Sequence, residues 1–218
     1  MRWAVLEGVP GAEVQQLLSI ARRRTFRPGE VVFHVDDPAD TLHLIVSGRF
    51  AVRIQTAVGD IAILAILGPG EIVGELALVG EESRRAATVE SLEAGETRSI
   101  HRPDFDRLRA AHPSVSDVVT AILAERLRRV NQRLLEALYV PADRRVLRRL
   151  LELADAYAPG APEPTVPLRQ EDLADIAGTS RATVNRVLRE EEARGAVRLG
   201  RGSTTVLDRP ALERRGRA

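Results

Sequence analysis

The sequence of 218 residues contains no cysteine and no lysine. Without cysteine there can be no disulfide, no thiolate metal site and no cysteine-ligated iron–sulfur cluster. All 32 basic residues are arginine, which we attribute mainly to genomic base composition rather than to function. No apolar run approaches membrane-spanning length, and Met1-Arg2-Trp3 leads into no signal-like segment. These absences predict a cytoplasmic protein with no membrane partner.

The chain is long enough for one large or two small domains, and its net charge of +1 hides an asymmetry along the sequence. Residues 1–141 carry 17 Arg against 19 Asp and Glu, a net of −2, whereas residues 142–218 carry 15 against 12, a net of +3. A basic excess attracts polyanions such as DNA. The excess is small, but it lies in the part of the chain to which the motifs described below assign DNA contact.

The first half of the chain has the hydrophobic pattern of a small β-domain preceded by one helix. Apolar residues at helical spacing predict that helix over residues 12–24. Short β-type runs separated by Gly, Pro and Asp predict strands over residues 30–35, 41–46, 50–54, 61–67, 86–92 and 97–101. Many short strands with turns between them indicate a barrel or jelly-roll arrangement. A short helix is predicted over residues 103–111.

The run GELALVGEESRRAAT, residues 74–88, contains the residue types needed to hold a cyclic phosphate. Gly74 permits close approach of the backbone, and the Glu75 carboxylate can accept a hydrogen bond from a ribose hydroxyl. Leu76–Val79 could form one helical turn whose free N–H groups face an anion. Arg85 offers a planar fork of donors suited to two phosphodiester oxygens.

A long helix is predicted from near Pro113 to Leu138, because residues 116–138 contain neither Gly nor Pro. Its apolar residues recur at alternating four- and three-residue steps, at Leu123, Leu127, Val130, Leu134 and Ala137. This spacing is typical of a coiled-coil seam. The alternative is a helix packed on its own domain. Charged and polar residues flank the narrow stripe, which favours a parallel homodimer.

Residues 139–143 interrupt that helix, since Pro141 cannot continue it and Asp143 can cap the next one. An apolar helix follows, then a Pro-rich loop over residues 158–167. Residues 170–194 are typical of a helix, a tight turn at Gly178-Thr179 and a second helix. Residues 195–208 predict two strands joined at Gly200–Gly202, which is the wing of a winged helix.

The second helix exposes polar residues near its start, where a recognition helix presents side chains to the major groove. Arg186 could bond bidentately to guanine, and Asn185 could read adenine or a phosphate. Arg201 and Ser203 at the wing tip are candidate phosphate contacts. The candidate DNA-binding residues are Ser180, Arg181, Thr183, Asn185, Arg186, Arg189 and Arg201.

The order of these parts resembles the bacterial family of the cyclic-AMP receptor protein and the fumarate–nitrate regulator, over about residues 10–208. The motifs GELAL…RRAAT and GTSRATVNRVL are its specific signatures. The resemblance implies an α+β fold with a cyclic-nucleotide-binding β-roll, jelly-roll-like, over residues 1–113. A dimerisation helix would follow over 114–138, a hinge over 139–143, and a winged helix-turn-helix domain over 144–218.

The resemblance also implies a set of ligand contacts, with Gly74 and Glu75 at the ribose and Arg85 at the phosphate. The positions that contact purine in the family fall at Arg126, Val130 and Asn131. The implied ligand-binding residues are Gly74, Glu75, Leu76, Ala77, Arg85, Ala86, Arg126, Val130 and Asn131.

Four positions depart from the family or compete with its pattern. Ala86 stands where bacterial members often have serine, although alanine occurs in the RAAT version of eukaryotic domains. Arg84 is an alternative to Arg85, but the RAAT register favours Arg85. Val130 replaces a threonine that reaches the adenine amino group, so adenine selectivity is weaker or rests on Asn131. Ala182 replaces a glutamate used on cytosine, which predicts a related but different half-site.

The implied function is that of a homodimeric transcription regulator controlled by cyclic AMP, with cyclic GMP as the second candidate. Its partners would be DNA with an inverted-repeat site and RNA polymerase. One alternative is a family regulator that needs no ligand or answers to another nucleotide. Another is an enzyme or a protein-gating sensor, but the sequence shows no nucleophile–base pair or carboxylate dyad. The four histidines have no metal-ligand spacing, so we expect neither metal nor haem.

Overall fold

The computed structural model describes residues 3–57, 59–78 and 84–217. They divide into two compact units, with Ile61–Ile63 grouped with the second unit and the main break between Arg129 and Val130 of α3 (Pro113–Tyr139). Within the described ranges, no helix is long and apolar enough to cross a bilayer. The domain boundaries given above remain predictions.

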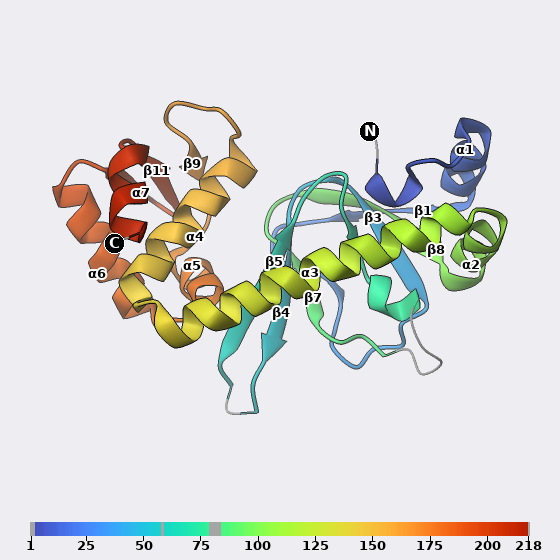
Figure 1. Ribbon diagram of the computed structural model, residues 1–218, viewed down its shortest axis with the longest axis horizontal. Coiled ribbons are helices and arrows are strands. Elements are labelled where there is room, and N and C mark those ends of the chain that lie inside the picture. The colour runs from blue at the N-terminus through green and yellow to red at the C-terminus, as the bar shows by residue number, and fades with distance from the viewer. Residues whose placement is uncertain (1–2, 58, 79–83, 218) are drawn as a thin grey trace. The chain divides into compact units, whose positions relative to one another are not determined.

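Two four-stranded antiparallel sheets form the framework of the first unit (Figure 1). One sheet has the order β1-β8-β3-β6, with strands Arg22–Phe26, Gly95–His101, Thr41–Ser47 and Ile72–Val73. The other has the order β2-β7-β4-β5, with strands Val31–Phe33, Thr88–Ser91, Phe50–Gln55 and Ile61–Leu67. Strands distant in sequence are neighbours in both sheets, as in a jelly roll. The predicted fold class is confirmed.

Short helices accompany the sheets: η1 (Ala4–Leu6), α1 (Gly11–Ile20), η2 (Glu75–Leu78) and α2 (Arg102–Ala111). The helix predicted over residues 12–24 is wrong at its C-terminal end, because α1 stops at Ile20 and the next residues form β1. β1 pairs with β8 from Arg22↔Ser99 to Phe26↔Gly95, and Arg23 adds an ion pair to Glu96 at 2.6 Å. This cross-strand ladder outweighs the helix propensity of the three consecutive arginines.

Alternation along β3 divides the apolar residues of the first unit between two cores. Leu42 and Leu44 are fully buried in a cluster that includes Phe105 of α2. Ile45, the next residue, belongs to a second cluster with Phe50 and other strand residues. The strand therefore separates a core under the helices from a core between the sheets.

The second unit contains the end of α3, four further helices and a small sheet. The helices are α4 (Ala142–Tyr157), α5 (Gln170–Ala177), α6 (Arg181–Ala193) and α7 (Arg209–Arg217). The sheet has the order β10-β11-β9, with strands Val197–Gly200, Ser203–Val206 and Thr165–Val166. The predicted helix-turn-helix and wing are present. β9, from the loop predicted as Pro-rich, adds a third strand, and α7 is an element that the pattern analysis missed.

Local chemistry sets the turn between α5 and α6. Gly178 ends α5 in the left-handed conformation (φ 60°, ψ 50°), and the Ser180 side chain accepts from the Thr183 N–H at 3.1 Å to begin α6. One expected cap is wrong. Pro141 occupies the N-cap of α4 with no side-chain cap bond, and Asp143 lies within the first turn. The Asp143 carboxylate bonds Arg186 instead.

Candidate functional site

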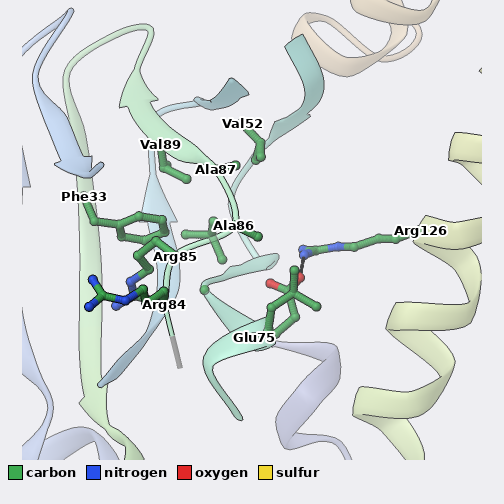
Figure 2. Close-up of a pocket in the computed structure, with 12 residues that line it drawn as sticks. Phe33, Val52, Glu75, Arg84, Arg85, Ala86, Ala87, Val89 and Arg126 are labelled. Carbon is green, nitrogen blue, oxygen red and sulfur yellow. Dashed lines mark ion pairs between the residues drawn. The ribbon is translucent and has the colours of Figure 1, made fainter. Parts of the chain in front are cut away.

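One pocket of the first unit collects most of the residues expected to bind a ligand (Figure 2). Strand residues supply apolar walls, and η2, the segment before β7 and α3 supply the polar groups. The lining residues are Phe33, Val52, Val73, Gly74, Glu75, Leu76, Arg84, Arg85, Ala86, Ala87, Val89 and Arg126. An apolar pocket with a few convergent polar groups is the usual form of a small-molecule site.

Arg85 is the buried cation of this pocket, with only 5% of the residue exposed. Its Nη1 donates to the Thr41 carbonyl at 2.8 Å, and its Nη2 donates to the Thr41 hydroxyl at 2.7 Å. The guanidinium carbon lies over the Phe33 ring, 4.0 Å from the centroid. The Nε is buried and finds no hydrogen-bond partner in the part of the chain that the structure describes.

The charge of Arg85 has no direct counter-ion in the part of the chain that the structure describes. Among the described residues, no carboxylate forms an ion pair with it within 4.0 Å. Burial lowers the pKa of the guanidinium, and the more distant charges of Asp40, Asp37 and Glu75 oppose the shift. An unpaired buried cation is costly unless a ligand compensates it. This arrangement favours an anion in the pocket.

Glu75 is the buried carboxylate of the pocket, 4% exposed at the start of η2. It forms an ion pair with Arg126 of α3, whose Nη2 also donates to the Ile72 carbonyl at 2.6 Å. Figure 2 shows Arg126 reaching Glu75, while Arg85 lies beside the Phe33 ring. Arg126 was expected at the purine. In this structure its guanidinium lies on the expected ribose acceptor, so a ligand hydroxyl would share the carboxylate with it.

Gly74 fits closely against the arginine. Its φ is +86°, and a Cβ there would lie 2.5 Å from Arg85 Nη1 and 3.0 Å from the Thr41 carbonyl oxygen. Glycine is therefore required for two reasons, backbone conformation and space. The sequence indicated a close approach at this position, and the structure identifies the Arg85 side chain as one partner in it.

His43 lies behind Thr41 as a buried neutral side chain. Its Nδ1 is 3.1 Å from the Thr97 hydroxyl, and its ring centroid is 5.9 Å from that of Phe33. Burial lowers the pKa of His43 to about 3, and the positive charges of Arg85 and Arg24 add to the shift. The ring is therefore uncharged near neutral pH and adds no positive charge beside Arg85.

No cluster of metal-ligating residues is present within the described residues.

The remaining expected ligand residues have different positions. Ala86 lines the pocket, and Leu76 lines it while 49% exposed. Ala77 belongs to η2, but its side chain lies outside the described residues, as does Val79 of the expected helical turn. Val130 and Asn131 belong to the second unit, exposed on α3.

Arg84 and Arg85, the two candidates for binding the phosphate, differ in burial. Arg84 is exposed, and its Nη1 donates to the Asp36 carbonyl at 2.8 Å, whereas Arg85 is buried in the pocket. Phe33 and Thr41, which hold Arg85, were not singled out from the sequence. They lie on β2 and β3, far before Arg85 in the chain, and no local motif marks them.

In the second unit, α6 exposes Arg181, Ala182, Asn185, Arg186 and Arg189 and buries Val184, Val187 and Leu188. This is the pattern expected for a recognition helix. Several of its polar groups bond within the protein. Asn185 Nδ2 donates to Gln170 Oε1 at 3.0 Å, and Arg189 pairs with Glu192 at 2.8 Å. The Ser180 and Thr183 hydroxyls are 3.0 Å apart. Arg201 is exposed at the wing tip.

Comparison with known proteins agrees with both units. Residues 23–112 match the cyclic nucleotide-binding domain family, and residues 144–215 match the Crp-like helix-turn-helix domain. The chain is 32% identical over 224 residues to the CRP-like cAMP-activated global transcriptional regulator of Mycobacterium tuberculosis, covering 99% of this chain and 97% of that protein. It is 34% identical over 209 residues to the cyclic AMP receptor protein of Thermus thermophilus, covering 96% and 94%.

Two solved structures show the same architecture. The Thermus thermophilus catabolite activator protein, 34% identical, aligns over 96% of both chains with a TM-score of 0.55. The c-di-GMP responsive global regulator CLP of Xanthomonas campestris, 21% identical, shares the fold with a TM-score of 0.79 over 90% of this chain and 99% of that chain. The chain thus belongs to the cyclic-AMP receptor protein/fumarate–nitrate regulator family of transcription regulators, with a cyclic nucleotide-binding domain and a DNA-binding helix-turn-helix domain.

Proposed function

We propose that the protein is a homodimeric DNA-binding regulator controlled by a cyclic nucleotide, with cyclic AMP as the first candidate. The observation that carries the ligand proposal is Arg85, a buried guanidinium with an unpartnered Nε and no carboxylate partner among the described residues. A cyclic phosphate supplies the missing negative charge. The names of the Mycobacterium and Thermus relatives support cyclic AMP.

We expect the phosphate and the ribose of the ligand to bind residues that line the pocket. Arg85 would bind the phosphate, and Glu75 would accept from the ribose hydroxyl while Arg126 holds its carboxylate in place. Apolar strand residues, among them Val52 and Val89, would pack against the sugar. Val130 and Asn131 are the candidates for contact with the base.

Dimer formation is supported by the exposed stripe on α3. Leu127, Leu134 and Leu138 are 61%, 57% and 63% exposed, and large apolar side chains at this spacing are typical of a helix that pairs with another. Leu127→Glu with Leu134→Glu should convert the dimer to a monomer in sedimentation velocity. Gln132→Glu, an exposed polar position outside the seam, is the control. A monomeric wild-type protein at micromolar concentration would contradict the proposal.

Calorimetric titration of the full chain tests the ligand. Cyclic AMP and cyclic GMP are the main probes, and cyclic di-GMP is included because one structural neighbour is described as responsive to it. Arg85→Ala should abolish binding, whereas Arg84→Ala, at an exposed residue on the rim of the same pocket, should leave binding measurable. Absence of saturable heat with cyclic AMP and cyclic GMP would leave a regulator that is ligand-independent or answers to another nucleotide.

The DNA role follows from α6 and the wing. A two-fold dimer would place two copies of α6 in adjacent major grooves, so the site should be an inverted repeat with half-sites about one helical turn apart. Mobility-shift assays with selected DNA, with and without cyclic AMP, measure the coupling between the two sites. Equal affinity in both states would remove the control by ligand but keep the DNA-binding role.

A further inference from the structure

We propose that Phe33 is a positioning residue for Arg85, holding its guanidinium by the face so that the edge donors stay available for an anion. This inference rests on the proposed cyclic-nucleotide site and adds a residue to it. Phe33 ends β2, and its ring packs against the core between the sheets. The guanidinium carbon of Arg85 lies 4.0 Å from the ring centroid.

The geometry separates two kinds of contact on one guanidinium. A ring stacked on the face attracts the cation through the negative face of its π-system. A phosphodiester approaches in the plane, where the N–H donors point. The two contacts do not compete, because they use different directions around the same group. Phe33 can therefore remain in place when an anion binds.

Thr41 bonds the edge of the Arg85 guanidinium but does not use all of its N–H donors. Its carbonyl takes one Nη1 hydrogen and its hydroxyl one Nη2 hydrogen. A guanidinium has five N–H donors, so Thr41 leaves one hydrogen on each Nη unused, and the buried Nε–H has no partner among the described residues. Phe33 and Thr41 together fix the plane and rotation of Arg85 before binding, which removes part of the ordering cost of association.

The surroundings of Phe33 explain why an aromatic ring is needed here. The residue contacts the neutral His43 ring on one side and the Arg85 cation on another. Among the described residues, no carboxylate pairs with Arg85, and its direct contacts with negative potential are the Phe33 ring face and the two Thr41 oxygens. A leucine would fill similar space but has no such face.

The first test needs no nucleotide. In the full chain labelled with ¹⁵N-arginine, the Arg85 Nε–H signal, assigned by its loss in Arg85→Lys, should be shifted by the ring current and exchange slowly with water. Phe33→Leu should remove the ring shift and speed the exchange, and Phe33→Trp should keep both features. An Arg85 signal unchanged by Phe33→Leu overturns the proposal, whether or not the protein binds a cyclic nucleotide.

The second test uses cyclic AMP by calorimetry. Phe33→Leu should weaken binding by about 2- to 30-fold, and Phe33→Tyr should stay within about 2-fold of wild type. The two phosphorothioate diastereomers of cyclic AMP distinguish positioning from general packing, since sulfur replaces one of two inequivalent oxygens. A fixed guanidinium discriminates between them, so Phe33→Leu should reduce the ratio of the two affinities. An equal loss for both diastereomers overturns the positioning role.

Failure of the proposed function gives a different result from failure of this inference. A wild-type protein with no heat of binding removes the cyclic-nucleotide assignment, and the NMR comparison still decides whether Phe33 holds Arg85. Val52→Ala is the control for loss of pocket volume, because Val52 lines the same pocket on another strand. It should weaken both diastereomers equally and leave the Arg85 signal unchanged.

Discussion

Asp143 and Arg186 form an ion pair at 2.6 Å that joins the first turn of α4 to the exposed face of α6. The other terminal nitrogen of Arg186 pairs with Glu190 at 3.0 Å. Arg186 is the side chain that we expect to bond a guanine edge. In this structure, however, both of its terminal nitrogens already have carboxylate partners. Contact with a base therefore requires these bonds to be exchanged or shared.

We predict that Asp143→Ala strengthens DNA binding by about 1.5- to 5-fold, the range expected from an exposed ion pair. The reason is that the guanidinium no longer has to leave Asp143. Mobility-shift titration of full-length protein measures the effect. In an Arg186→Ala background, which itself should lose roughly 10-fold or more, the Asp143 substitution should have no effect. A similar gain in both backgrounds would show that only general charge repulsion was removed.

Gly74→Ala tests the contact between the glycine and Arg85. The new Cβ would meet Arg85 Nη1 at 2.5 Å, so the guanidinium must move and cyclic-nucleotide affinity should fall at least about 10-fold. Backbone strain at φ +86° adds a stability cost of about 1–3 kcal/mol. Gly160→Ala is the matched control, because Gly160 has φ +76° and nothing within 4 Å of its Cβ position. Gly160→Ala should lower the stability of the protein by a similar amount and leave its cyclic-nucleotide affinity unchanged.

Stability should depend on pH through His43. The unfolded residue titrates near 6.5, whereas in the fold its pKa is lowered to about 3, chiefly by burial. Between these values the unfolded state binds a proton that the native state does not. The free energy of unfolding should therefore fall by about 1.4 kcal/mol per pH unit below about 6.5 because of this group.

Urea unfolding at pH 7 and pH 5 checks this expectation. The difference between the two pH values should be about 2 kcal/mol smaller in His43→Gln than in wild type. His101→Gln is the control, since His101 is exposed. Equal pH dependence in wild type and His43→Gln would mean that His43 is not held neutral.

A buried ion pair connects the last turns of α3 with α4. Glu136 and Arg149 bond each other with side chains only 8% and 6% exposed, and Arg148 adds a second contact to Glu136 at 3.1 Å. Arg149→Met would leave Glu136 buried without its main partner and should destabilise the protein by about 3–5 kcal/mol in thermal unfolding. The double variant Glu136→Leu, Arg149→Met should recover most of this loss. A double variant no more stable than the single one would show that packing, not charge, sets the cost.

The spacing of residues close together in the sequence was sufficient to predict α6 and the turn before it. The exposed and buried positions of α6 follow the helical period, Gly178 adopts the expected left-handed turn, and Ser180 caps the helix. Each of these features depends on residues a few positions apart. For that reason a single sequence contains the information, and the burial pattern, the turn and the cap predicted for α6 are confirmed.

Pattern reasoning failed where the partner is distant. Arginines at positions 22–24 continue a helical pattern, but β8 supplies a strand partner that only the fold brings near. Asp143 has a residue type suited to capping, yet Arg186 lies close enough to take its carboxylate. In each case a tertiary contact outweighed a local preference.

The motif around Arg85 shows the same division. By itself the sequence determined that residues 74–88 carry a glycine, a carboxylate and an arginine in the order used for a cyclic phosphate, because these are neighbours along the chain. Only the tertiary structure decided that Arg85 is buried, lies over the Phe33 ring, bonds Thr41 and has no carboxylate partner among the residues that the structure describes. Those partners lie on strands that come together through sheet pairing, and burial is a property of the packed fold.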